Sequence, residues 1–100
     1  MEIREENRDG QIELFVSGEI DGTNVKEFED KLNASSDKTQ SLVLNLEDLE
    51  YVSSTGLRVF LTLQKSMRAR GAEVIIRNVK DEVMDIFSVT GFVKLLNIEV

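Results

Sequence analysis

Three consecutive hydroxyl side chains, Ser53, Ser54 and Thr55, precede Gly56, where an acidic and apolar lead-in meets a long apolar-rich segment. A hydroxyl there could cap a helix, act as a nucleophile, help to hold a phosphate, or accept one. A cap needs only one hydroxyl, because a single Ser or Thr oxygen accepts an amide hydrogen of the first turn. Ser53 and Ser54 are both candidates for that role.

Two of these four roles lack the residues that they require. The chain has no histidine and no cysteine, so no Ser-His-Asp triad and no thiolate or histidine metal site can be built. The segment YVSSTGL lacks the flanking glycines of a nucleophile elbow, and neither common glycine-rich phosphate-binding motif occurs. We therefore expect no catalytic residue, no metal and no cofactor. The remaining readings are a helix cap and a hydroxyl that receives a phosphate.

Composition limits the location and the partners. The net charge of −7 opposes binding to nucleic acid or to anionic membrane surfaces, because both depend on clustered Lys and Arg. No stretch of about 18 apolar residues occurs, and the first ten residues are highly charged, so no membrane insertion is expected. The absence of cysteine favours an intracellular location. We expect a cytoplasmic protein with a single domain over residues 1–100.

Apolar spacing and turn residues predict alternating strands and helices. Asp9-Gly10 favours a tight turn between two antiparallel strands, and cations followed by Gly71 end the longest helix. The short apolar run at 41–46 is typical of a central strand covered on both faces. The expected strands are 2–6, 11–17, 41–46, 73–77 and 93–98, and the expected helices are 24–33, 54–70 and 80–90.

This order of elements predicts an α/β fold. Strands that alternate with helices pair in parallel through right-handed crossovers, and the opening hairpin adds an antiparallel edge. We expect a small layer structure with a mostly parallel central sheet, an N-terminal antiparallel strand and helices packed on it. Functional surfaces of such sheets lie outside the carboxyl ends of the strands. The segment EDLEYVSSTG, residues 47–56, is expected to be such a loop, leading into the second helix.

Three segments in order resemble a known family. They are VSGEID at 16–21, VLNLEDLEYVSSTGLRVFLTLQKSMRARGAEVIIRNV at 43–79, and FSVTGFVKLLNI at 87–98. Together they look like a STAS domain of the bacterial anti-sigma factor antagonist type, and the resemblance spans nearly the whole chain. It implies a binding switch and not an enzyme. In that family a partner that is both serine kinase and anti-sigma factor phosphorylates the antagonist, and a separate serine phosphatase removes the phosphate.

The resemblance assigns roles to individual residues. The phosphorylated serine of the family stands two places before the glycine, which is Ser54 here, with Ser53 and Thr55 as its neighbours. Asp21 is implied to lie near Ser54, and Gly56 and Leu57 to open the helix that docks on the partner. The family's antagonists usually have an aspartate immediately before the phosphoserine, whereas this chain has Ser53.

Other readings of these segments remain open. Asp21 could simply cap the helix that begins near Thr23, and Glu47, Asp48 and Glu50 could be a solvated face or a negative surface around Ser54. The alternative function is a STAS module that is never phosphorylated and that binds a nucleotide, a lipid or a transporter partner.

Overall fold

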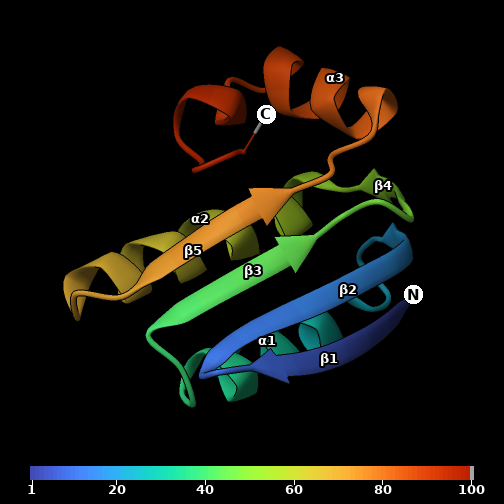
Figure 1. The fold of residues 1–100 in the computed structure, drawn as a ribbon. Helices are drawn as coiled ribbons and strands as arrows, with labels where there is room; N and C mark the ends of the chain where they lie inside the picture. The colour runs from blue at the N-terminus through green and yellow to red at the C-terminus, as the bar shows by residue number, and fades with distance from the viewer. Residues whose placement is uncertain (100) are drawn as a thin grey trace.

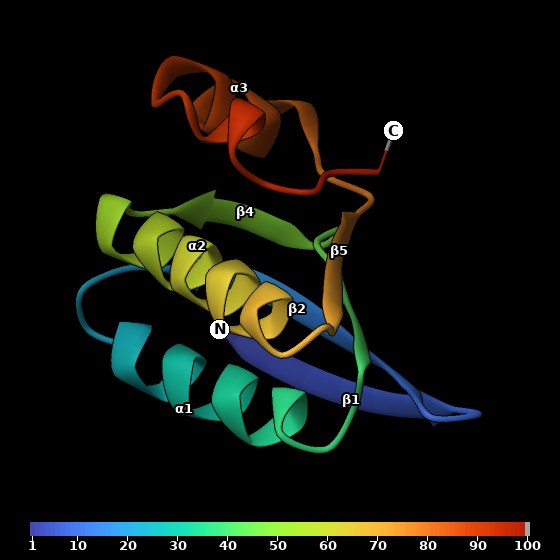
Figure 2. The same ribbon diagram turned by 90° about the vertical axis from the view of Figure 1, so that its left-hand side faces the viewer.

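The computed structural model describes residues 1–99 and contains a five-stranded sheet with helices α1 and α2 on one face (Figures 1 and 2). The strands run in the order β1-β2-β3-β5, β4 pairs with β2, and only β1 and β2 are antiparallel. This arrangement confirms the predicted α/β class. The elements are β1 Glu2–Arg8, β2 Gln11–Ile20, α1 Val25–Ser36, β3 Ser41–Asn45, β4 Leu49–Val52, α2 Ser54–Ala69, β5 Glu73–Arg77, α3 Asp81–Val89 and the 3₁₀-helix η1 Phe92–Lys94.

The opening hairpin follows from its two turn residues. Asp9 has a φ of 55° and Gly10 a φ of 89°, which is the left-handed pair that a two-residue type I′ turn requires. The twist of this turn matches that of the flanking strands, so pairing continues without interruption from Arg8 opposite Gln11 to Glu2 opposite Ser17. The first two strands are therefore longer than the sequence predicts.

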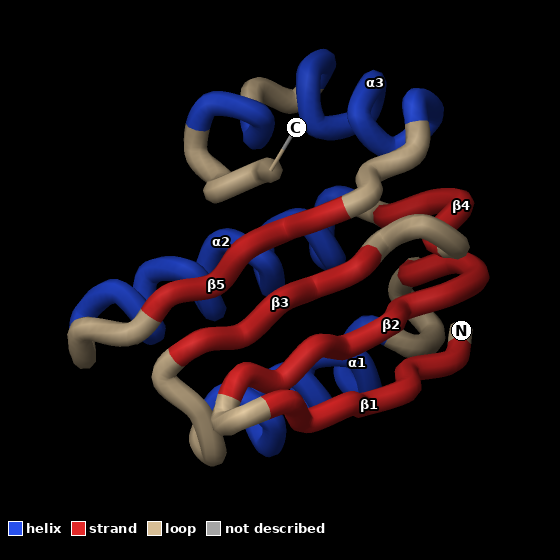
Figure 3. Tube along the Cα trace, viewed as in Figure 1, coloured by secondary structure: helices blue, strands red, loops and turns tan. Residues whose placement is uncertain are grey.

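Strand β2 changes partners along its length (Figure 3). Residues 12–15 pair with β3 and residues 18–20 pair with β4. Within the pairing with β4 the register shifts between Gly18, which lies opposite Leu49, and Glu19, which lies opposite Tyr51. Gly18 has a φ of 88°, a conformation that residues with a side chain rarely adopt. Strand β4 was not predicted, because residues 47–56 were interpreted as one loop. That interpretation is wrong for residues 49–52.

The core lies between the sheet and the helices. Phe60 of α2 packs edge-on against Phe28 of α1 and Phe87 of α3, with ring centroids 5.3 Å and 6.0 Å apart. Edge-to-face pairs add about 0.5–1.5 kcal/mol to the free energy gained from burial. One aromatic residue from each α-helix thus joins the three helices to the same core.

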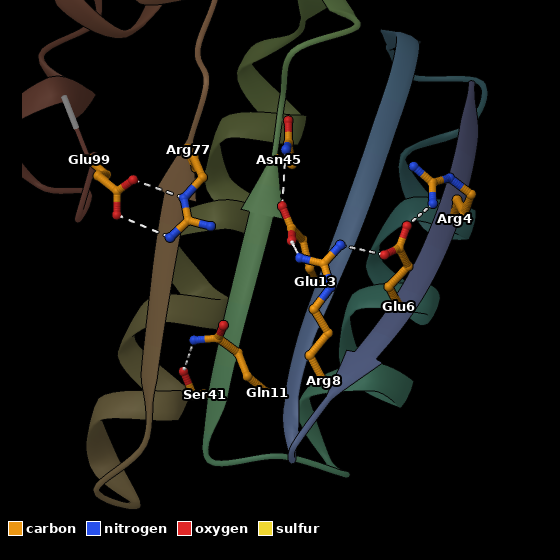
Figure 4. A network of polar contacts seen from close by, with 9 residues as sticks. All are labelled: Arg4, Glu6, Arg8, Gln11, Glu13, Ser41, Asn45, Arg77 and Glu99. Atoms are coloured by element: carbon orange, nitrogen blue, oxygen red, sulfur yellow. Dashed lines mark hydrogen bonds and ion pairs between the residues drawn. The ribbon is translucent and has the colours of Figure 1, made fainter.

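The opposite face of the sheet carries a network of polar side chains instead of helices (Figure 4). Glu13, only 6% exposed, accepts hydrogen bonds from Arg8 and Asn45, and Arg77 forms an ion pair with Glu99. The prediction that residues 41–46 contain a central strand covered on both faces agrees with the burial of residues 42–46, including Val43, which is fully buried. On this face the cover comes from side chains of the sheet and not from a helix.

The C-terminal segment differs from the strand predicted at 93–98. It forms η1 and then a single bridge between Ile76 and Ile98, with backbone bonds from Ile76 to the Asn97 carbonyl and from Glu99 to the Ile76 carbonyl. The side chain of Gln64 in α2 holds this segment, donating to the Leu95 carbonyl and accepting from the Asn97 amide. These bonds cover the outer edge of β5. Among residues 1–99, no helix is both long and apolar enough to cross a membrane.

Glu5 of β1 joins the sheet to α1 and makes stability depend on pH. Hydrogen bonds from Ser35 and Lys38, together with Lys31, lower the pKa of Glu5 from 4.5 to about 2. The charged form is favoured by folding, so this stabilisation is present above pH 4.5 and is lost as the pH falls towards 2. Between neutral pH and pH 2, we expect the free energy of unfolding to fall by about 1 kcal/mol more in wild type than in Glu5→Gln. The difference is this small because solvent screens the partly exposed ion pairs of Glu5.

Denaturant titrations across that pH range measure this difference. The matched control is Glu27→Gln, which removes an exposed carboxylate of α1 that forms no ion pair within residues 1–99. Parallel pH profiles for wild type and Glu5→Gln would contradict the prediction.

Candidate functional site

The hydroxyl cluster and Asp21 lie at the same end of the sheet, where β2 and β4 both finish. The Ser53 amide donates to the Ile20 carbonyl at 2.9 Å, which extends the β2–β4 pairing by one bond. Asp21 follows Ile20, and Ser54 follows Ser53. The parallel strands thus bring two segments about 30 residues apart in sequence to the same end of the sheet, where the family resemblance implies that Asp21 lies.

Ser53 is the N-cap of α2. Its φ of −77° and ψ of 169° are extended, and its Oγ accepts a hydrogen bond from the Gly56 amide at 3.3 Å. The Leu57 amide donates to the Ser53 carbonyl, which closes the first helical turn. The sequence left Ser53 and Ser54 as candidates for the cap, and the structure selects Ser53. Serine and aspartate are both good N-cap residues, so Ser53 serves in a position where the resembling family usually has aspartate.

Ser54 begins the helix with an exposed side chain. Within residues 1–99 its hydroxyl makes no hydrogen bond, whereas the Ser53 Oγ lies 2.9 Å from the Thr55 Oγ1. Thr55 is also exposed. The three hydroxyls are therefore not equivalent, because two interact with each other and the one between them projects into solvent unpaired.

Gly56 allows the start of α2 to approach the strands closely. A Cβ at this position would lie 2.6 Å from Val52 Cγ2 and 2.9 Å from Ile20 Cγ2, distances that real Cβ atoms do not show. The backbone at Gly56 is therefore closely packed against both strands. Leu57 is 1% exposed and belongs to the core, so its side chain anchors the helix and does not present an apolar surface to a partner.

Asp21 organises the turn between β2 and α1. Its Oδ1 accepts hydrogen bonds from the Thr23 hydroxyl and the Thr23 amide, at 2.6 Å and 2.9 Å, and these bonds lower the pKa of Asp21. Asn24 is the N-cap of α1, although its side chain bonds outside the helix, to the Asp21 amide and the Glu19 carbonyl. Asp21 is therefore a charged turn residue beside the hydroxyl cluster and not the cap of α1.

The acidic residues before the cluster are spread along β4. Glu47 and Asp48 precede the strand and line a surface hollow of about 260 Å³ with Arg4 and Phe15, while Glu50 lines another with Lys80 and Glu82. Asp48 lies five residues before Ser53, which is about 16 Å along a strand that rises about 3.3 Å per residue. Glu47 and Asp48 therefore do not surround Ser54, and only Glu50 lies within the strand that leads to it.

Two further residues flank the cluster and were missed in the sequence. Tyr51 is the only tyrosine of the chain and is 45% exposed, two residues before the cap. Arg58 is exposed at the position four residues after Ser54, which places it on the same side of the helix one turn later. The signal for Arg58 was its i+4 spacing from Ser54, and the signal for Tyr51 was a large aromatic ring next to polar residues.

This arrangement offers a free hydroxyl without groups that would activate it. Among residues 1–99, no group of three or more acidic side chains could hold a metal ion. The positive end of α2 lies at Ser54, and a helix N-terminus stabilises negative charge. The first turn of α2 therefore favours negative charge near the exposed Ser54 hydroxyl.

Comparisons with known proteins agree with the fold and its resemblance. The STAS domain family model matches residues 2–100. The anti-sigma-B factor antagonist of Listeria monocytogenes is 32% identical over 101 aligned residues, which cover 99% of this chain and 87% of that protein. The antagonist of Staphylococcus aureus strain NCTC 8325 is 31% identical, with 98% and 92% covered. The solved structure of the anti-sigma factor antagonist SpoIIAA in its unphosphorylated form has a TM-score of 0.80 at 18% identity, with 99% and 89% covered.

The packing at Gly56 generates a stability prediction. Gly56→Ala should lower the free energy of unfolding by about 1–3 kcal/mol, because the new methyl group overlaps Val52 and Ile20. Gly22→Ala is the matched control, since a Cβ there meets no atom within 4 Å. Adding Val52→Ala to Gly56→Ala should cost less than the sum of the two single substitutions. Denaturant midpoints are measured for the three single variants and for the double variant. If the losses from Gly56→Ala and Val52→Ala simply add in the double variant, the contact between these positions is contradicted.

The cap assignment generates a second prediction. Ser53→Ala should lower the free energy of unfolding by about 0.5–2 kcal/mol, and Ser53→Asp should restore most of it, because aspartate also caps helices. Ser54→Ala should change stability by less than Ser53→Ala, because the Ser54 hydroxyl makes no bond within the described chain. Denaturant unfolding compares the three variants. A larger loss at Ser54 than at Ser53 would show that the cap is Ser54.

Proposed function

The chain belongs to the STAS domain family, among the anti-sigma factor antagonists, and from this premise we propose that it is a binding switch controlled by phosphorylation of Ser54. The antagonists of this family are regulators and not enzymes. In the proposed switch, the unmodified protein binds an anti-sigma factor that is also a serine kinase. Phosphate on Ser54 ends this binding, and a separate serine phosphatase restores it, all within the cytoplasm.

The observation that carries the proposal is the free hydroxyl of Ser54 at the first turn of α2. The role of cap is filled by Ser53, so modification of Ser54 removes no bond that the fold needs. A kinase can reach the exposed side chain without unfolding the helix. SpoIIAA, which shares this fold, is known in a phosphorylated form, whose structure has a TM-score of 0.74 at 17% identity, with 99% of this chain and 92% of that one covered.

The surroundings of Ser54 favour a folded, phosphorylated state. A phosphate carries a charge of about −1.5 to −2 at neutral pH, and the N-terminus of α2 stabilises negative charge. Arg58, one turn further along, can reach such a group as an i+4 neighbour. Phosphorylation is therefore expected to change the surface of the domain and not its fold.

The same modification would prevent docking. The proposed docking surface comprises the exposed residues around the start of α2, with Tyr51 as its large apolar side chain. Aromatic residues are common anchors of protein interfaces, and an unpaired charge buried at the centre of an interface costs several kcal/mol. Each 1.4 kcal/mol is a tenfold change in affinity, so a thousandfold switch is within reach.

Asp21 and Thr55 complete the proposed surface. Asp21 is held in its turn by Thr23, and its lowered pKa keeps it charged beside the end of β4. Gly56 and Leu57 contribute from beneath, since both are buried and fix where the helix begins. Their part in the switch is therefore to position Ser54 and not to touch the partner.

Phosphorylation by the partner kinase tests the proposal directly. Incubation with ATP and the cognate ATPase of the anti-sigma factor type should add one phosphate to the intact mass, and peptide mapping should place it on Ser54. Ser54→Ala should remain unmodified, while Ser53→Ala and Thr55→Ala, as matched hydroxyl controls, should still be phosphorylated. Phosphate on Ser53 or Thr55 in wild type would overturn the assignment.

Affinity for the unmodified protein tests the docking half of the proposal. Ser54→Ala should bind the ATPase as wild type does, whereas Ser54→Asp should bind at least tenfold more weakly because it places a permanent charge in the interface. Ser53→Asp adds the same charge one residue earlier, at the cap, and should weaken binding less. Calorimetry or surface plasmon resonance measures these values. Tight binding of Ser54→Asp would contradict the switch.

A further inference from the structure

The two edges of the sheet differ in whether another segment of the chain covers them. The β5 edge is covered, because Ile76 exchanges backbone bonds with the C-terminal segment and the Asn97 side chain donates to the Val74 carbonyl at 3.1 Å. The β1 edge has no such cover within residues 1–99 (Figures 1 and 3). Natural proteins protect long edge strands with prolines, bulges, covering segments or charged side chains. Of these, β1 has only the charges, since it has seven residues, no proline and no shift of register.

The backbone groups exposed at this edge can be identified from the hairpin. In a two-residue hairpin the residues that flank the turn, Arg8 and Gln11, exchange both backbone bonds, and such pairs alternate along the ladder. The even-numbered residues of β1 therefore bond to β2. The amide and carbonyl groups of Ile3, Glu5 and Asn7 point away from β2, and these are the groups that an added strand would bond.

Charges of alternating sign line this strand on the open face of the sheet. Glu2, Arg4, Glu6 and Arg8 share that face, where Arg4 and Arg8 both form ion pairs with Glu6 (Figure 4). A second copy can lie antiparallel to β1 with Glu5 opposite Glu5 of the other copy. Every facing pair on the open face is then of opposite charge, with position 2 opposite 8 and position 4 opposite 6.

The registers nearest to this one lack this property. If the second strand slides by two residues in either direction, Arg4 faces an arginine and Glu6 or Glu2 faces a glutamate. A parallel arrangement also places like charges at the same level. Facing charges of opposite sign stabilise strand pairs and like charges destabilise them. A slide by four residues restores opposite charges but keeps only two facing pairs instead of four, so the register centred on Glu5 is the most favourable.

We propose that the β1 edge is a self-association surface, through which two copies of this chain pair antiparallel about Glu5. The exposed groups of Ile3, Glu5 and Asn7 then bond to those of Asn7, Glu5 and Ile3 of the other copy, and the two sheets become continuous. The two facing Glu5 carboxylates do not oppose this, because each is held by Lys31 and Lys38 of its own helix side. The occupant of the edge is thus a second copy of the chain.

A pair of charge-reversal variants tests both the edge and its register. Arg4→Glu leaves glutamate at positions 4 and 6, and Glu6→Arg leaves arginine at both, so each variant places like charges together in its own dimer. Each should dimerise at least about tenfold more weakly than wild type. When the two variants are mixed, position 4 again faces an opposite charge at position 6 in both halves, and a heterodimer should form.

Sedimentation velocity over a concentration series measures these equilibria, and circular dichroism checks that each variant is folded. Lys65→Glu is the control for Arg4→Glu, since it makes the same change in net charge on an exposed part of α2 and should dimerise as wild type does. The wild-type dimer should dissociate with a Kd below about 1 mM and should weaken with salt.

Three outcomes would overturn the proposal. They are a wild type that stays monomeric at about 1 mM, a folded Arg4→Glu variant with unchanged dimerisation, and the failure of the two variants to associate when mixed. A monomeric wild type whose β1 edge is protected from hydrogen exchange only by an added foreign peptide would show that the edge serves another strand.

Discussion

The close contact of Gly56 with Ile20 and Val52 is the constraint on which the candidate site depends. It fixes the first turn of α2 against the ends of β2 and β4, and no side chain larger than hydrogen fits between them. With the helix start held there, the Ser53 amide bonds to the Ile20 carbonyl and its hydroxyl turns back to cap the helix. The exposure of Ser54 is a consequence of this geometry, because the next residue of a capped helix points outward.

Local signals in the sequence predicted most of the fold. Asp9-Gly10 predicted the hairpin, and the cations before Gly71 predicted where α2 ends, because both depend on backbone conformations that few residues adopt. Strand β4 was missed because it is short, lacks strict alternation, and pairs with the end of β2 beyond the residues that pair with β3. The segment 93–98 has apolar residues suited to a strand, but Gln64 holds it as a short helix and a bridge.

The candidate site was predicted in location but not in detail. The family resemblance implied that Asp21 lies near the hydroxyl cluster, and the parallel pairing of β2 with β4 brings the two segments to the same end of the sheet. The choice between Ser53 and Ser54 as cap could not be read from the sequence, since it rests on one bond to Ile20 from a strand that is distant in the chain. The separation of Glu47 and Asp48 from Ser54 likewise depends on β4. Sequence neighbours were spread along a strand instead of gathering around a loop.

The covered edge of β5 has a consequence for the order in which the parts of the domain can form during synthesis. Until Asn97 and Ile98 have left the ribosome, the backbone of Val74 and Ile76 has no partner on its outer side, although α2 and the rest of the sheet are already translated. During synthesis the edge of β5 therefore stays open until this later segment has emerged. Gln64 of α2 offers both polar atoms of its amide to the arriving segment, so a side chain that is translated earlier positions the backbone that closes the edge.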